Sequence, residues 1–132
     1  MKKFGNTLML VLLIAAVFIY YTEMTPLKTD AVTLATSYSK NKTKADNKFL
    51  EKQLEVTGTV KVFYKLDEIR NVLELKTGDS DMSLFCFFVN EIDEKKAAML
   101  SEGDTVIVTG KCKGLENYNF VDGVTIEVKK IE

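Results

Sequence analysis

The chain has 132 residues, of which 46% are hydrophobic and 28% are charged, and its formal net charge is −1 at pH 7. This length holds one domain of ordinary size, which argues against a two-domain enzyme. The sequence contains no His and no Trp, so Ser-His-Asp catalysis, Cys-His catalysis and imidazole-dependent metal sites are excluded. Because no paired carboxylates, activated nucleophile or metal-ligand cluster stands at a meaningful spacing, we expect a non-catalytic protein without a cofactor or a metal.

The N-terminal segment is the most apolar part of the chain. Lys2 and Lys3 precede an apolar run over residues 8–21, which reaches 18 residues when it is counted from Phe4. At about 1.5 Å per residue this run spans about 27 Å, close to the thickness of a bilayer core. Since it ends in bulky residues and lacks a small-residue cleavage site, we interpret residues 1–21 as an uncleaved signal anchor, with residues 4–21 in the membrane; a buried core helix is the alternative. The positive-inside rule then predicts a single-pass protein of the cell membrane, with its N-terminus in the cytoplasm and residues 22–132 outside.

A linker and an amphipathic helix are expected over residues 22–50. Apolar residues recur at helical spacing toward both ends of residues 30–50 and less across residues 39–44, so we predict one helix with Asn41 as the place for a break. Five Lys stand between Ser39 and Lys52 against two acidic residues. We interpret them as a solvated helix face, with contact to acidic headgroups or polymers as the alternative.

Alternation of apolar and polar residues predicts the first strand over residues 54–62. Gly58, in its middle, indicates a bulge or bend that lets one strand serve two sides of a small barrel. The strand of residues 83–89 is apolar on both faces, so something must cover its outer side. The other elements that we predict are strands over residues 71–76, 105–113 and 124–131, a helix over residues 92–100 and a loop over residues 114–123.

Five strands with a helix between the third and the fourth are the order of an OB-fold, a five-stranded Greek-key barrel. We therefore expect a mainly β fold with flanking helices, in which residues 51–132 form the barrel. The barrel part carries 10 basic and 15 acidic side chains from Gln53 to the end. This excess of acidic groups argues against non-specific binding of DNA or RNA by the barrel, because such binding relies on cations.

Several stretches carry a closer resemblance: Tyr38, followed by ADNKF at residues 45–49, LEVTGTV at 54–60, FCFF at 85–88 and LSEGDTVIVTGKCKG at 100–114. Over about residues 30–132 the chain resembles the tRNA-anticodon-binding-like (tRNA_anti-like) OB-fold family of exported bacterial proteins. The resemblance implies an N-terminal signal or anchor, a helix and an OB barrel, and it implies no settled biochemical function. Members commonly have a further Cys in the last strand, whereas residues 125–129 contain none. This departure leaves Cys86 and Cys112 as the available pair.

The two cysteines have two interpretations. In an exported chain they can form a disulfide, and otherwise they are two small buried hydrophobic residues. The third and fourth strands are not neighbours in an OB barrel, so a bond would have to cross the interior within a Cα distance of about 7 Å. We favour the buried free thiols.

OB barrels bind ligands on their second and third strands, framed by the loops after the first and fourth strands. The candidate ligand-binding residues are Tyr64, Lys65 and Arg70 from the first loop and Tyr118, Asn119 and Phe120 from the other, with whichever of Phe85, Phe87 and Phe88 point outward. Aromatic rings with cations nearby stack on bases or sugar rings. The alternative is that the helix of residues 30–50 covers these phenylalanines. The acidic residues Asp67, Glu68, Asp79 and Asp81 lack the spacing of a calcium loop and indicate a solvated turn.

We therefore expect a membrane-anchored, extracytoplasmic OB-fold module that binds an envelope protein or glycan through its barrel face. Binding of single-stranded RNA or DNA is the alternative. Fold analogy favours it, whereas the net charge and the expected location disfavour it.

Overall fold

The computed structural model describes residues 7–17 and 25–132. Residues 7–17 are helical, and their large apolar side chains are exposed, with exposed fractions between 55% for Leu13 and 66% for Val17. The predicted anchor, residues 4–21, lies partly outside the described residues. Within residues 7–17 and 25–132, no helix has the length and apolar character needed to cross a membrane.

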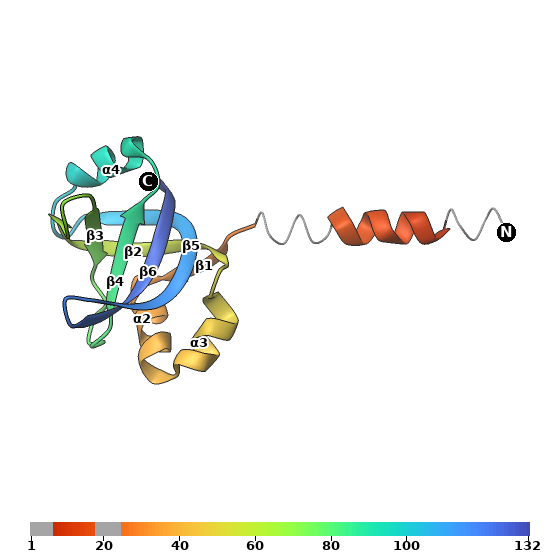
Figure 1. Cartoon of the computed structure of the whole chain (residues 1–132), viewed down its shortest axis with the longest axis horizontal. Coiled ribbons are helices and arrows are strands. Elements are labelled where there is room, and N and C mark those ends of the chain that lie inside the picture. Colours follow the sequence, from red (N-terminus) through yellow and green to blue (C-terminus); the bar gives the residue numbers. More distant parts are fainter. Residues whose placement is uncertain (1–6, 18–24) are drawn as a thin grey trace.

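The predicted barrel is confirmed, and its sheet has six strands rather than five (Figure 1). Five of them close the barrel in the order β2-β3-β4-β6-β5, with β5 pairing back to β2, and only β4 and β6 pair in parallel among these five. Their bounds are Gln53–Lys65 for β2, Asn71–Leu75 for β3, Ser83–Phe88 for β4, Thr105–Tyr118 for β5 and Val121–Ile131 for β6. The added strand β1, Leu27–Asp30, runs parallel to β2 with Leu27 opposite Leu54. Its four residues carry no alternation, so the sequence indicated a linker there.

Strand β2 serves two sides of the barrel, as expected, but the irregularity does not lie at Gly58. Residues 53–59 pair with β5 and residues 60–65 pair with β3, and the register shifts between Val60 and Val62. Gly58 is instead required by close packing, because a Cβ atom there would lie 2.9 Å from Leu75 Cδ1 and 3.1 Å from Ala31 Cβ. The absence of a side chain therefore lets the first turn of helix α2 approach the strand.

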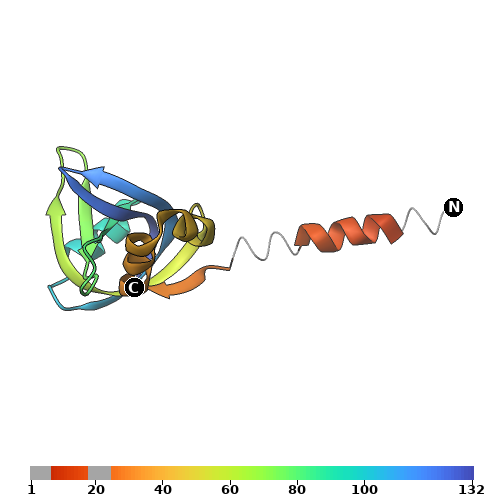
Figure 2. The ribbon, with the colours of Figure 1, turned by 90° about the horizontal axis from the view of Figure 1, so that it is seen from below.

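The predicted helix of residues 30–50 is two helices, α2 (Ala31–Lys40) and α3 (Lys42–Phe49), divided at Asn41 as expected. The Asn41 backbone N–H donates to Ser37 O at the end of α2, and its side chain accepts from Lys44 N at the start of α3. The side chains that these helices bury join the barrel core; they are Ala31, Leu34, Ala35, Tyr38, Ala45 and Phe49. Helices α2 and α3 therefore close one end of the barrel, and α4 (Glu91–Ala98) lies at the other end (Figures 1 and 2).

The loop predicted over residues 114–123 is mostly strand. Strand β5 continues to Tyr118 and β6 begins at Val121, so Asn119 and Phe120 alone form the turn, with φ angles of 51° and 68°. Two-residue hairpin turns of this kind need left-handed backbone at both central positions and usually carry Asn-Gly or Asp-Gly. Phe120 stands where that pattern has Gly, which is why the sequence did not indicate a tight hairpin.

A disulfide between Cys86 and Cys112 was the wrong alternative, because both thiols are free and buried. Each of the two residues is paired in register with Ile126, from opposite sides of β6. One strand thus separates them, which places their Cα atoms about 9–10 Å apart, beyond the limit of about 7 Å for a disulfide. Burial raises the pKa of the Cys86 thiol to about 12, so this group stays protonated and unreactive.

Candidate functional site

The outer face of strands β3, β4 and β6 carries the candidate site. Inward side chains on these strands form the core: Leu73, Leu75, Leu84, Cys86, Val124, Ile126 and Val128. The period of two then turns the alternate side chains outward: Val72, Glu74, Phe85, Phe87, Thr125 and Glu127. Phe88 points inward, where its ring centroid lies 6.3 Å from that of Phe63. Phe85 and Phe87 are therefore the outward phenylalanines.

Tyr118, at the end of β5, lies across both of these phenylalanines. Its ring centroid is 5.5 Å from that of Phe85, edge to face, and 5.3 Å from that of Phe87. Gly123 provides the space beneath, because a Cβ atom there would collide with the Phe85 ring. Phe85 is consequently only 3% exposed, whereas Phe87 and Tyr118 are half-buried and form the surface.

Arg70 completes this surface from the loop before β3. Its guanidinium carbon lies 5.3 Å from the Phe87 ring centroid and 5.6 Å from the Tyr118 ring centroid, which is cation–π distance. Asp67 holds the group in place: Oδ2 accepts from Arg70 Nε at 2.8 Å and lies 2.7 Å from Nη2. The bond from Arg70 lowers the pKa of the Asp67 carboxyl. We call Arg70, Phe85, Phe87 and Tyr118 the aromatic face.

Both tyrosines on this side of the barrel are neutral hydrogen-bond donors at neutral pH. Partial burial, followed by the carboxylate of Glu116, raises the pKa of Tyr118, whose hydroxyl donates to Glu116. Burial and the neighbouring Glu74 raise the pKa of Tyr64. Tyr64 shares a cross-strand row with Phe87, but Val72 stands between them.

The charges around the aromatic face are acidic or already paired. Four carboxylates lie next to its residues: Glu74 and Glu127 pair in register with Phe85 and Phe87, Glu116 accepts from the Tyr118 hydroxyl, and Asp67 accepts from Arg70. Of the cations, Arg70 is paired with Asp67, and Lys61 Nζ lies 3.2 Å from Glu74 Oε1. Rings are thus exposed for stacking without a positive groove for phosphates.

Two exposed apolar residues are close in sequence to residues of the aromatic face. Ile69, next to Arg70, is 89% exposed, and Phe120, in the turn after Tyr118, is 100% exposed. The φ angle of Phe120 is 68°, a left-handed conformation that is a genuine outlier for a bulky residue. We call Ile69 and Phe120 the apolar tips.

The predicted site residues therefore fall into two groups. The structure brings Arg70 and Tyr118 together and places Asn119 and Phe120 at the edge of the same surface. Tyr64 and Lys65 lie beyond β3, where Lys65 is exposed and stands opposite Asn71.

Covering of this surface by the helices of residues 30–50 is not observed, because α2 and α3 close the barrel end. Sequence reasoning missed Asp67, Ile69 and Gly123 as parts of the site. The spacing of Asp67 and Arg70 was the available signal, since an Asp often bonds backbone N–H groups two and three residues ahead in a turn, as Asp67 does here.

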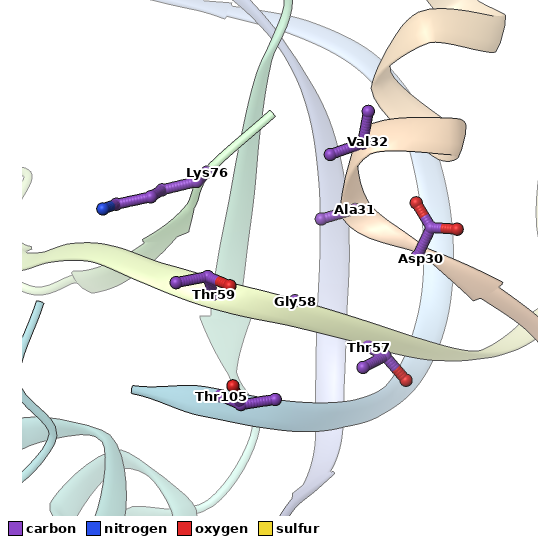
Figure 3. Close-up of a pocket in the computed structure, with 8 residues that line it drawn as sticks. All are labelled: Asp30, Ala31, Val32, Thr57, Gly58, Thr59, Lys76 and Thr105. Carbon is purple, nitrogen blue, oxygen red and sulfur yellow. The ribbon is translucent and has the colours of Figure 1, made fainter. Parts of the chain in front are cut away.

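A pocket of about 220 Å³ lies elsewhere, between the end of β1 and strand β2 (Figure 3). Its polar groups do not converge on a ligand: Asp30 caps α2 by accepting from Thr33 N, and Lys76 Nζ lies 3.5 Å from Glu102 Oε1. Figure 3 shows the Lys76 side chain extending away from Asp30. The aromatic face is the stronger candidate.

Comparisons with solved structures agree with the barrel. Asparaginyl-tRNA synthetase from Pyrococcus horikoshii is 20% identical with a TM-score of 0.51, and the match covers 64% of this chain and 19% of the synthetase, about a fifth of its length. A proposed nucleic acid-binding lipoprotein from Klebsiella pneumoniae is 14% identical with a TM-score of 0.58, covering 80% of this chain and 92% of that one. OBody AM2EP06 bound to hen egg-white lysozyme is 18% identical with a TM-score of 0.50, covering 64% and 81%. At these identities the likeness shows the OB-fold alone.

The family is identified by comparison of the sequence with family models. No curated protein matches the chain. The tRNA_anti-like family, one of OB-fold binding domains, matches residues 21–124, which is most of the length. The chain therefore belongs to the tRNA_anti-like family.

Proposed function

We propose that this protein is a non-catalytic binding module that takes an envelope protein or glycan on its aromatic face. The observation that carries the proposal is Phe120, which is fully exposed and held at a φ angle of 68° in the turn that follows Tyr118. Such backbone costs stability for a bulky residue, and an exposed ring contributes nothing to the core. A binding partner that covers the ring supplies the missing stabilisation.

The apolar tips favour a protein as this partner. Binding energy at protein interfaces is concentrated in aromatic and Arg side chains surrounded by neutral contacts. Arg70, Phe87 and Tyr118 provide such a centre, with Ile69 and Phe120 beside it. The lysozyme-bound OBody is a related fold with a protein partner, which supports this choice without naming a partner for the present chain.

The same proposal places the barrel outside the cytoplasm, tethered by residues 4–21. The helical state of residues 7–17 and their exposed apolar side chains support it, as do Lys2 and Lys3 before the apolar run. Addition of protease to intact cells, followed by intact mass of the surviving chain, tests it. Digestion of residues 25–132 from outside, with residues 1–21 still joined to them beforehand, is the expected result; full protection overturns this location.

Single-stranded nucleic acid is the second candidate, favoured by the nucleic acid-binding lipoprotein of similar fold and by stacked rings beside Arg70. The carboxylates of Glu116 and Glu127, beside Tyr118 and Phe87, oppose it. The test is titration of labelled single-stranded RNA and DNA with the full chain in detergent, at low and at physiological salt. We expect no saturable binding; binding that weakens steeply with salt and is lost in Arg70→Gln would move nucleic acid to first place.

Site-specific photo-crosslinking in cells tests the protein partner. A photoreactive residue replaces Phe120 in the full chain, and the control replaces Glu102, which is also exposed but belongs to a different loop. We expect one discrete adduct from position 120 and none from position 102, and we expect Phe87→Ala to abolish it. An adduct that persists in Phe87→Ala contradicts the proposal, and an adduct whose mass falls after digestion with glycan-cleaving enzymes identifies a glycan.

A further inference from the structure

A second surface of the barrel is strongly basic. Five lysines lie on or next to α3, and all five are exposed; they are Lys40, Lys42, Lys44, Lys48 and Lys52. We call them the lysine surface. They precede the acidic segment that begins at Gln53, and the function proposed above leaves them unused.

The carboxylates within this surface are already neutralised by lysines. Asp46 Oδ2 lies 2.9 Å from Lys42 Nζ. Glu51 lies between two lysines of the neighbouring strand β5, at 3.0 Å from Lys113 and 3.6 Å from Lys111. Among the described residues, Lys40, Lys44, Lys48 and Lys52 form no ion pair with a carboxylate, so their charges are available to an external anion.

The lysine surface lies on the side of the barrel where β1 begins. Leu27 of β1 stands opposite Leu54, two residues after Lys52. Figures 1 and 2 both show α3 beside β1, with the β2–β3 and β5–β6 connections on the opposite side of the barrel. Those connections carry the apolar tips, so the basic and the aromatic surfaces face in different directions.

The chain length between this side and the proposed anchor is short. Only residues 22–24 separate residue 21 from Thr25, the first residue of the second described range. The four Cα–Cα steps from residue 21 to Thr25 reach at most about 14 Å even when fully extended. An anchored chain therefore brings the side of the barrel that carries β1 and α3 close to the headgroups.

We propose that the lysine surface rests on anionic phospholipid headgroups and thereby holds the aromatic face away from the bilayer. The proposal depends on the membrane anchor proposed above. Lysines near a negatively charged membrane are attracted within about one Debye length of the surface, roughly 8–10 Å at ordinary salt. Single-stranded nucleic acid is also anionic, but only the membrane is held near this side of the barrel by the chain itself.

Paramagnetic broadening measures the orientation directly. The full chain is placed in lipid nanodiscs that carry a gadolinium headgroup, made either from neutral phosphatidylcholine or with about one-third phosphatidylglycerol. In anionic discs we expect the amide signals of α3 to broaden while those of Asn119 and Phe120 stay sharp. In neutral discs, or at about 1 M salt, where the Debye length is about 3 Å, the difference should disappear.

Two triple variants with the same change in charge provide the matched comparison. Lys40→Gln, Lys44→Gln and Lys48→Gln together should reduce the broadening of α3 in anionic discs by more than about threefold. The control variant changes Lys95, Lys96 and Lys129 to Gln, three exposed lysines away from α3, and should leave it unchanged. Broadening that ignores lipid charge, or that both variants reduce equally, overturns the proposal.

Failure of the anchor and failure of the lysine surface give different results. Flotation with neutral vesicles comes first: a chain that does not float refutes the anchor. A chain that floats, but shows no charge-dependent broadening at α3, refutes the lysine surface alone. Binding of a single-stranded oligonucleotide by the wild-type chain that only the Lys40, Lys44 and Lys48 variant loses would assign the surface to nucleic acid instead.

Discussion

Two aromatic clusters of this barrel contain the same kinds of residue, a Tyr, a Phe and a nearby cation, but differ in how far their rings are buried. Under α2 and α3, Tyr38 packs with Phe49 at 6.4 Å between ring centroids, and Lys48 lies 5.2 Å from the Phe49 ring. On the outer face, Tyr118 packs with Phe87, and Arg70 lies over both rings. Tyr38 and Phe49 are 2% and 1% exposed, whereas Phe87 and Tyr118 are half-buried.

The difference lies in what covers the rings. The hydroxyl of Tyr38 lies 3.7 Å from Cys112 Sγ in a buried contact, and burial is the main cause that raises its pKa. The hydroxyl of Tyr118 reaches a carboxylate at the surface. The first cluster is completed by the chain itself, and the second leaves one side of its rings for a partner.

The largest test of this comparison removes one ring from each cluster. Phe49→Ala should lower the free energy of unfolding by about 3–5 kcal/mol, because it leaves a cavity under the helices. Phe87→Ala should cost about 1–2 kcal/mol, since the ring is only half removed from water. Denaturant unfolding of both variants measures the difference, and equal losses would break the comparison.

A smaller effect follows from adding one carbon beneath the outer cluster. Gly123→Ala should displace the Phe85 ring, lower the free energy of unfolding by about 1–3 kcal/mol and shift the NMR signals of the Tyr118 ring. Gly103→Ala is the control, because a Cβ atom there meets nothing within 4 Å. It adds backbone strain at a positive φ angle but should leave the Tyr118 signals in place; a shift in both variants contradicts the prediction.

A substitution at Phe120, one of the two apolar tips, should change the free energy of unfolding in the opposite direction. Phe120→Gly removes a bulky residue from left-handed backbone and should raise the free energy of unfolding by about 0.5–1 kcal/mol, while it abolishes binding of the partner. Asn119→Gly, at a φ angle of 51°, should change stability by less than about 0.5 kcal/mol, because Asn tolerates this region. Thermal and denaturant unfolding measure both, and a loss of stability in Phe120→Gly would mean that the ring packs against the fold.

The smallest effect is a change in protonation. Arg70→Gln should return the pKa of Asp67 toward its ordinary value, because the bond from Arg70 is the largest cause that lowers it. A lowered pKa in the folded state stabilises the protein above the ordinary pKa of Asp, about 3.9, and this stabilisation is lost as the pH falls through the folded pKa. In Arg70→Gln, the free energy of unfolding should therefore no longer contain this pH-dependent contribution from Asp67.

NMR titration of the carboxyl carbons measures the change in Asp67. Asp46, whose pKa is lowered chiefly by Lys42, is the internal control and should titrate as in the wild-type chain. Equal changes in Asp46 and Asp67 would contradict a local effect of Arg70.

The sequence predicted the barrel because its information is local. Alternation over residues 54–62 and 105–113, and the break at Asn41, follow from side-chain periodicity and capping, and the structure confirms them. Strand β1 and the hairpin at Asn119 and Phe120 were missed, because neither alternation nor a turn glycine marks them. Their conformation is imposed by pairing with strands distant in the sequence.

The candidate site was predictable in kind and not in arrangement. Arg70 and Tyr118 could be selected as loop residues near the ligand face, but their contact depends on how far β5 extends and on the register of β6. The same register separates Cys86 from Cys112 and places Gly123 beneath Phe85. Residue types can be chosen from a sequence, whereas distances across strands need the sheet.

The parallel pairing of β1 with β2 has a mechanical consequence. Residues 27–30 run alongside residues 54–57 in the same direction, so a pull on the chain before Thr25 acts along the strand axis. Such a force loads the hydrogen bonds of the pair together, in shear, rather than opening them one after another. A partner that drags on the barrel would therefore meet a strand that resists as a unit, with the load passed directly to β2, the strand that joins both sides of the barrel.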